Sequence, residues 1–175
     1  ASRPKRILVA PLDWGLGHAT RCIPLIRELL DLGCEVVVGA DGPPAKLLAA
    51  EFPALERLAL PGYGIRYGGT AAAFGMRMLA QLPAIREAVR RENRVLREWL
   101  SAHPLDAIIS DNRFGLHAPG VPAVIMTHQL DIRSPFGPLS QRVLRAANYH
   151  YIRRFDACWV VDFAGQDNLA GALSH

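Results

Sequence analysis

Short apolar runs alternate along the chain with longer segments whose apolar positions recur at helical spacing. The runs predict strands at 6–12, 34–40, 55–60, 106–110, 122–127 and 157–161, and the longer segments predict helices at 18–32, 45–51, 71–101 and 138–155. This alternation is typical of βαβ units, which build a parallel sheet with helices on both faces. We therefore predict an α/β, Rossmann-like domain over 1–162 and a tail or the start of an interdomain linker at 163–175.

Glycine and proline mark where these elements begin and end. Gly33 suits the left-handed cap of the first helix, and Pro43 and Pro44 suit the first turn of the second. Pro83 predicts that the long helix is bent or broken at that point. The segment 61–70 lacks periodicity and is rich in glycine, so we expect an exposed loop there, of the kind that carries ligand contacts.

The composition is that of one globular domain, with 50% hydrophobic and 21% charged residues among 175. No apolar run approaches the roughly 20 residues of a membrane helix, and the basic N-terminus reads as the approach to a first strand, not as a signal peptide. Cys22, Cys34 and Cys158 stand in apolar patterns and are expected to be reduced, buried thiols. A cytoplasmic location is expected, with peripheral contact at the inner face of the membrane left open.

The net charge is +4, and most of the basic residues are arginine. Guanidinium groups bind phosphate well, so the excess could serve a phosphate-rich ligand or an anionic membrane, although codon bias together with a solvated helix face is the favoured explanation. The polar side of the long helix is expected to carry five of them: Arg86, Arg90, Arg91, Arg94 and Arg97. The arginines are not interleaved with aromatic residues, and no nucleic acid is expected as a partner.

The turn after the first predicted strand carries the clearest chemical signal. In open α/β sheets, ligands bind beyond the carboxyl ends of the strands. Gly15 and Gly17 allow a tight turn and close approach of the backbone, and the helix that follows offers unpaired amides to an anion. We therefore expect Gly15, Leu16, Gly17 and Thr20 to bind substrate, with a phosphate or diphosphate as the fitting group.

His18 and Asp111 are predicted to form a catalytic pair. Each follows a strand, so both should lie at the ligand-binding edge of the sheet, where a carboxylate can orient an imidazole that acts as general base. The alternatives are that His18 caps the helix and that Asp111 caps the turn at Asn112 and Arg113.

Other polar residues follow strands in the same way. We expect Asn112, Arg113, Thr127, His128 and Gln129 to contact substrate, although such residues are often only turn formers. Arg133 has a weaker claim as a phosphate ligand. The remaining histidines show no metal-site spacing and are expected to be structural: His103, His117, His150 and His175.

Two nucleotide-binding motifs fit poorly. The turn lacks the Gly-Lys-Ser/Thr ending of a P-loop, and Thr20 stands where a dinucleotide fingerprint has its third glycine. Asp41, at the end of the second strand, keeps a dinucleotide site open as an alternative.

The residues quoted so far resemble the N-terminal domain of GT-B glycosyltransferases, near the family of the lipid II-forming N-acetylglucosaminyltransferase and related UDP-sugar transferases. The resemblance rests on Ile7-Leu8-Val9 leading into Gly15-Leu16-Gly17-His18-Ala19-Thr20-Arg21, then Pro24-Leu25, and on Ser110-Asp111-Asn112-Arg113. It implies a metal-independent inverting transferase without a cofactor, in which His18 removes the proton of a sugar or lipid-linked acceptor and Asp111 orients His18.

The resemblance also implies a C-terminal domain that binds most of the nucleotide-sugar donor and that this chain does not contain. The chain is then expected to be the acceptor-side half, either cut at the domain boundary or naturally split, and to be inactive alone.

Two alternatives stay open. The pattern Gly-His-x-x-Arg-Cys over 17–22 also resembles the nucleotide-sugar hydrolase of pseudaminic acid biosynthesis, in which the histidine would activate water. A non-catalytic docking module is the second, with the arginine-rich helix on anionic lipid or a partner. An apolar patch could assist it, formed by Tyr63 to Tyr67 with Phe74, Met76, Met78 and Leu79.

Overall fold

The computed structural model describes residues 3–63, 71–127 and 137–161, with the backbone alone for 71–82 and 138–139. Six parallel strands form one sheet in the order β3-β2-β1-β4-β5-β6. The strands are β1 (Arg6–Pro11), β2 (Glu35–Ala40), β3 (Glu56–Ala59), β4 (Ala107–Asp111), β5 (Ala123–Thr127) and β6 (Ala157–Val160). The helices are α1 (Leu16–Asp31), α2 (Gly42–Glu51), α3 (Ala71–Leu100) and α4 (Pro138–Ile152). This is the doubly wound order of the Rossmann fold, as predicted.

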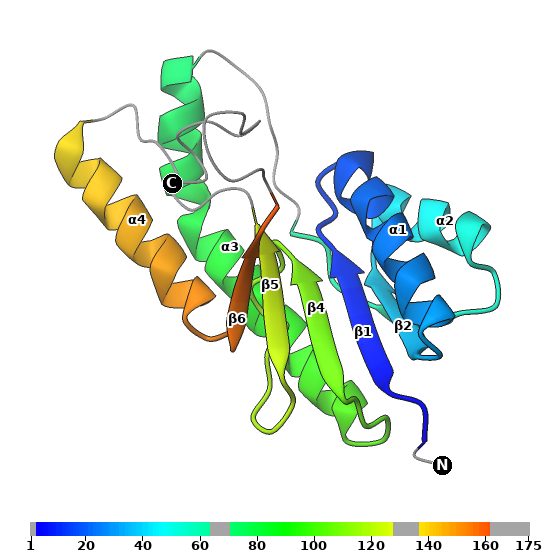
Figure 1. Ribbon diagram of the computed structural model, residues 1–175. Helices are drawn as coiled ribbons and strands as arrows, with labels where there is room; N and C mark the ends of the chain where they lie inside the picture. The colour runs from blue at the N-terminus through cyan, green and yellow to red at the C-terminus, as the bar shows by residue number, and fades with distance from the viewer. Residues whose placement is uncertain (1–2, 64–70, 128–136, 162–175) are drawn as a thin grey trace.

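Both faces of the sheet are covered by helices (Figure 1). Side chains that alternate along a strand point to opposite faces, so Leu8 and Val9 in β1 enter different cores. Val9 packs with Ala19, Cys22 and Ile26 of α1. Leu8 belongs to the second core, beneath α3 and α4; its helical members include Leu96 and Ile152. Burial on both faces explains why the strands read as continuous apolar runs.

The predicted boundaries agree with the structure to within a few residues. Gly33 follows α1 with φ 78°, which a residue without a Cβ adopts readily. The two prolines of α2 lie in its first turn, where a missing N–H costs nothing.

Of the bend or break expected at Pro83, the break was wrong, because α3 runs through it as one helix of 30 residues, and the bend stays a prediction. The arginines of α3 behave as expected, since Arg86, Arg90, Arg91, Arg94 and Arg97 are all exposed.

Two expectations about exposure also need correction. Tyr63, expected in an exposed loop, is buried, because its hydroxyl donates to Glu92 and accepts from the amide of Phe114. The rest of that loop, 64–70, lies outside the described residues. Only Cys22 of the three free thiols is fully buried, whereas Cys158 is exposed on β6 at the end of the strand order. Among the helices that the structure describes, none has the length and apolarity needed to span a membrane.

Candidate functional site

The chain reverses its winding between β1 and β4, the two central strands. From β1 the chain moves to β2 and β3 on one side, and it returns through α3 to β4 on the other. Pro11 is in register with Asp111, and the amide of Leu12 extends the pairing by donating to the Asp111 carbonyl at 3.0 Å. The loops that leave two such strands diverge and open a crevice at their carboxyl ends, which is where ligands bind in this fold.

The glycine turn lies at this crevice. Gly15 donates its amide to the Asp13 carbonyl at 3.0 Å and has φ 82° and ψ 175°, a conformation that is almost confined to glycine. It is the N-cap of α1, and no side chain caps that helix end. Leu16 is exposed, and the Thr20 hydroxyl donates to the Gly17 carbonyl within the first turns of α1. The first-turn amides of an α-helix have no partner within the helix, so the start of α1 is suited to bind an anion, and anion binding there stays a prediction.

His18 and Asp111 meet in the crevice. His18 Nδ1 lies 3.0 Å from Asp111 Oδ2, which joins the first turn of α1 to the end of β4. The Asp111 side chain is fully buried and that of His18 is 13% exposed. Nδ1 lies between a carboxylate, which can only accept a hydrogen bond, and the guanidinium of Arg21, which can only donate one. The tautomer with the proton on Nδ1 donates to Asp111 and leaves Nε2 with its lone pair. The pair has the geometry of a general base with an orienting carboxylate.

Arg21, one turn after His18 on α1, completes the cluster and was not predicted as a site residue. Its Nε and Nη2 lie 2.7 and 2.6 Å from Asp111 Oδ2 and Oδ1, so the guanidinium holds the carboxylate through both oxygens. Nη2 also lies 2.5 Å from His18 Nδ1. The spacing of three residues from His18 is the signal that could have found it, because residues i and i+3 share a helix face.

The turn after Asp111 sends the next two side chains into the protein. Asn112 has φ 57°, a left-handed conformation that asparagine tolerates, and it is buried. The Ser110 hydroxyl closes the turn by donating to the Arg113 carbonyl at 2.6 Å and accepting from the Arg113 amide.

Arg113, predicted to contact substrate, lies in the protein interior, and its role at the site stays a prediction. Its side chain is fully buried and ion-paired with Glu92 of α3, and it donates to the carbonyls of Pro11 and Pro61. Burial raises the pKa of Glu92, and Arg113 opposes that shift. Burial, together with the charge of Glu92, also holds the pKa of Tyr63 well above its usual value. This network joins α3 to the end of β1 and to the segments that follow β3 and β4.

The remaining predicted contacts are placed less completely. Thr127 ends β5 next to β4 and is buried at the same edge of the sheet. His128, Gln129, Arg133 and His175 lie outside the described residues. Asp41, the acid of the dinucleotide alternative, follows β2 as the N-cap of α2, and its carboxylate lies against Gly62 beside that of Asp13.

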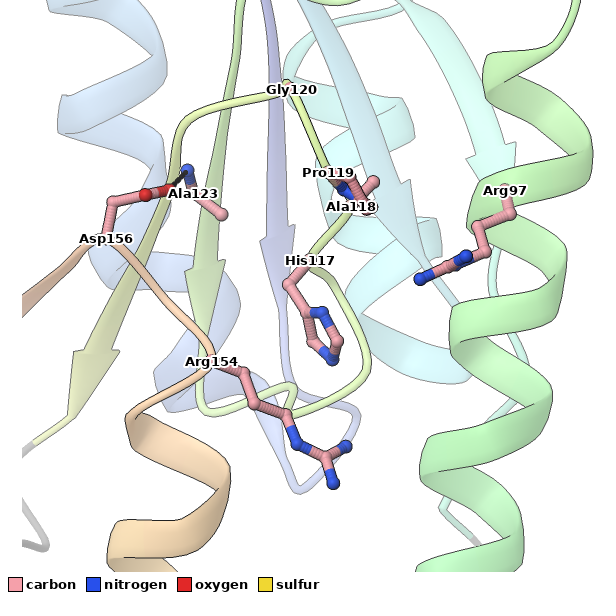
Figure 2. Close-up of a pocket in the computed structure, with 8 residues that line it drawn as sticks. All are labelled: Arg97, His117, Ala118, Pro119, Gly120, Ala123, Arg154 and Asp156. Carbon is pink, nitrogen blue, oxygen red and sulfur yellow. Dashed lines mark hydrogen bonds between the residues drawn. The ribbon is translucent and has the colours of Figure 1, made fainter.

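A hollow lies at the amino ends of β5 and β6, at the opposite end of the strands from His18 and Asp111. Figure 2 shows Arg97, His117 and Arg154 around it, with Asp156 accepting the amide of Ala123 at 2.8 Å. Burial lowers the pKa of His117, and the positive charges of Arg154 and Arg97 lower it further. His103, which follows α3, stacks on Trp99 of that helix. His150 of α4 contacts Tyr151 and Arg154. No group of three His, Cys, Asp or Glu side chains that could hold a metal occurs in the described part of the chain.

Comparison with known proteins identifies the fold. No protein-family model and no curated protein matches the sequence. Among solved structures, MurG of Acinetobacter baumannii matches with a TM-score of 0.58 at 13% identity, covering 94% of this chain and 44% of that one. UGT89C1 of Arabidopsis thaliana in complex with quercetin matches with a TM-score of 0.59 at 15% identity, covering 92% and 44%. The spinosyn rhamnosyltransferase SpnG in complex with thymidine diphosphate matches with a TM-score of 0.56 at 18% identity, covering 89% and 44%.

These neighbours are glycosyltransferases of the GT-B fold, and the chain spans about half of their length. Sequence identities this low establish similarity of fold and nothing further. The chain therefore has the Rossmann-like fold of the N-terminal half of a GT-B glycosyltransferase.

Proposed function

We propose that this chain is the acceptor-binding domain of a metal-independent, inverting glycosyltransferase that uses a nucleotide-activated sugar. The observation that carries the proposal is the contact of 3.0 Å between His18 and Asp111 at the carboxyl ends of β1 and β4. A histidine oriented by a buried carboxylate at this crevice is suited to accept a proton from a bound hydroxyl.

The reaction that fits these groups is a direct displacement. His18 Nε2 takes the proton of an acceptor hydroxyl while the hydroxyl oxygen forms a bond to the anomeric carbon of the donor. The bond from that carbon to the diphosphate breaks on the opposite side, and the nucleoside diphosphate leaves with the electron pair, so the configuration inverts. Asp111 stabilises the imidazolium that forms, because its oxygen already accepts the Nδ1 proton.

The start of α1 supports a diphosphate as the leaving group. Its N-cap, Gly15, has no side chain that could cap the helix, and the helix dipole favours negative charge at this end. SpnG and SsfS6, two of the structural neighbours, were solved with thymidine diphosphate. We propose a UDP-sugar as the donor for this protein, held mainly by a C-terminal domain, and a sugar or lipid-linked hydroxyl compound as the acceptor. A cytoplasmic location, with contact at the inner membrane face, stays part of this proposal.

The test is release of nucleoside diphosphate by the full-length protein. A panel of UDP- and TDP-sugars is supplied with and without a pool of sugar, lipid-linked and phenolic acceptors, and the products are identified by mass spectrometry. We expect release to require an acceptor, and His18→Ala and Asp111→Asn each to lower kcat/KM by about 10²-fold or more. His150→Ala is the matched control, because this exposed histidine lies on α4 away from the crevice.

The other outcomes separate the alternatives. Release into water alone, still dependent on His18, would replace the transferase with a nucleotide-sugar hydrolase. No release from any donor by a folded protein would contradict both enzymes and leave a docking module. In that case co-sedimentation with anionic vesicles, compared with a variant in which Arg90, Arg91 and Arg94 are glutamate, tests the exposed arginines of α3.

A further inference from the structure

Asp111 presents an electrostatic problem that His18 alone does not solve. Its side chain is fully buried, and a buried carboxylate is costly unless an opposite charge and hydrogen bonds compensate it. A neutral imidazole supplies one hydrogen bond and no charge. Arg21 supplies both, with one donor on each carboxylate oxygen at 2.7 and 2.6 Å. This two-point contact fixes the rotation of the carboxylate as well as its charge.

Arg21 also faces the imidazole itself. Nη2 lies 2.5 Å from His18 Nδ1, while Asp111 Oδ2 lies 3.0 Å from the same nitrogen. A proton on Nδ1 is attracted by the carboxylate and repelled by the guanidinium. The two neighbours therefore act in opposite directions on the charge of His18: Asp111 favours the imidazolium, and Arg21 disfavours it.

These contacts point to a role in the proposed reaction. We propose that Arg21 is the positioning residue of the pair: it holds Asp111 in the orientation that accepts the Nδ1 proton, and its positive charge offsets the attraction of Asp111 for a second proton on His18. The inference rests on the proposed function, in which His18 acts as a base and must begin unprotonated. With a neutral imidazole, the charges of Asp111 and Arg21 cancel within this group of three side chains.

Two charged groups of the described residues lie within hydrogen-bond distance of His18: Asp111 from β4 and Arg21 from α1. The Cys22 thiol lies in the same electrostatic environment, and it stays uncharged because burial, followed by the negative charge of Asp111, raises its pKa far above the usual range. Removal of the Arg21 charge should therefore shift the protonation of His18 in one direction, toward the imidazolium at higher pH.

The first experiment needs no turnover. The ring protons of His18 are followed by NMR against pH in the chain itself, in the wild type and three variants. Arg21→Gln keeps a donor to Asp111 but removes the charge, whereas Arg21→Lys keeps the charge but loses the two-point contact. Arg27→Met is the matched control. It removes another arginine of α1, which pairs with the carboxylate of Glu51 on α2, away from the crevice.

We expect the titration midpoint of His18 to rise by about one pH unit in Arg21→Gln, and to stay near the wild-type value in Arg21→Lys and Arg27→Met. A midpoint in Arg21→Gln equal to that of the control would overturn the proposal. If Arg21→Gln does not fold, Asp111→Asn is compared with the double variant Arg21→Gln/Asp111→Asn, which leaves no buried carboxylate unpaired. The double variant should then titrate at the higher pH, and equal midpoints would contradict the inference.

Kinetics of the full-length protein separate this inference from the function on which it rests. The acid limb of the kcat/KM profile should move to higher pH in Arg21→Gln, whereas Arg21→Lys should lower kcat without moving that limb. If Arg21 had only a structural role, Arg21→Gln would lower the unfolding temperature and leave the acid limb of the kcat/KM profile in place. That result would overturn the positioning role. A wild-type protein without turnover, but with the expected NMR shifts, would count against the transferase and keep the electrostatic role of Arg21.

Discussion

At the scale of single residues, the two glycines of the turn have different reasons to be glycine. Gly15 has φ 82° and ψ 175°, so the backbone itself excludes a side chain there. Gly17 lies inside α1 without a positive φ, and a Cβ built on it meets nothing within 4 Å. The fold therefore does not require glycine at 17. A surface left open beside His18 is what close approach of a substrate requires.

Substitution of Gly15 should cost stability. Gly15→Ala forces a Cβ into a backbone conformation that L-residues avoid, and we expect the free energy of unfolding to fall by about 1–3 kcal/mol. Urea denaturation followed by circular dichroism measures it. The companion Gly17→Ala should be neutral or stabilising by up to about 1 kcal/mol, because alanine favours the helix. If both variants lose the same stability, the distinction between the two glycines is wrong.

Gly17→Ala also has a functional consequence. The proposed function predicts that this stable variant raises KM for the donor or the acceptor, because its new methyl group enters the surface that the substrate approaches. Steady-state kinetics of the full-length protein measure this. An unchanged KM for both substrates would mean that the glycine is not needed for binding.

At the scale of elements, a buried ion pair fastens α3 beneath the crevice. Glu92 and Arg113 are both fully buried, and they join α3 to the turn after β4. Arg113 also reaches the carbonyl of Pro11 at the end of β1, and Tyr63 donates to Glu92 at 2.8 Å. The end of β1 and the segments that follow β3 and β4 are therefore joined to α3 by one cluster of buried polar side chains.

The two members of this pair should not be equally costly to lose. Glu92→Gln leaves a guanidinium that cannot deprotonate in a buried site, and we expect a loss of about 3–5 kcal/mol in the free energy of unfolding. Arg113→Met leaves a carboxyl group that can take a proton, and its pKa is already raised by burial. A raised folded-state pKa means that the folded protein binds more protons than the unfolded chain, so Arg113→Met should gain stability relative to the wild type as pH is lowered. Guanidinium denaturation at several pH values tests this, and identical pH dependence of the two variants would contradict it.

The elements were largely predictable from the sequence, because their cause is local or periodic. Apolar runs gave the strands, helical spacing gave the helices, and the glycine after Leu32 gave the end of α1. Pro83 failed as a helix breaker, because a proline lowers helix stability without settling the outcome, and the rest of a long helical pattern can outweigh it. The burial of Tyr63 and Arg113 was not predicted, because it depends on their contacts with Glu92, which the pattern of single positions does not reveal.

At the scale of the whole molecule, the doubly wound topology explains why the site could be predicted in part. Residues that follow parallel strands meet at one edge, so His18 and Asp111 could be paired without knowledge of the structure. Arg21 could not be assigned in this way, because its contact depends on the rotation of α1 over the sheet. The roles of these side chains remain proposals, whereas their placement is a property of the fold.

The hollow at His117 lies at the amino ends of the strands, away from His18 and Asp111. The contribution of His117 to stability can therefore be tested separately. Burial, followed by Arg154 and Arg97, lowers its pKa below the ordinary 6.5. The unfolded chain then binds more protons than the folded one. The contribution of neutral His117 to the free energy of unfolding is therefore fully present above about pH 6.5 and is lost as the pH falls toward the folded-state pKa. We expect the loss to be well below the limit of about 1.4 kcal/mol per pH unit, because His117 is only partly buried and solvent screens its charge.

His117→Phe should remove this acid-sensitive term, because a phenyl ring can keep the edge-on contact with Phe155 and carries no titrating proton. Unfolding curves of the wild type and the variant between pH 7.5 and 5.5 should diverge in slope, with the variant flatter. Turnover by the full-length protein should stay unchanged, because the hollow at His117 and the crevice at His18 lie at opposite ends of the strands. Equal slopes would show that His117 does not control acid stability, and a loss of turnover would show that the two edges are coupled through the sheet.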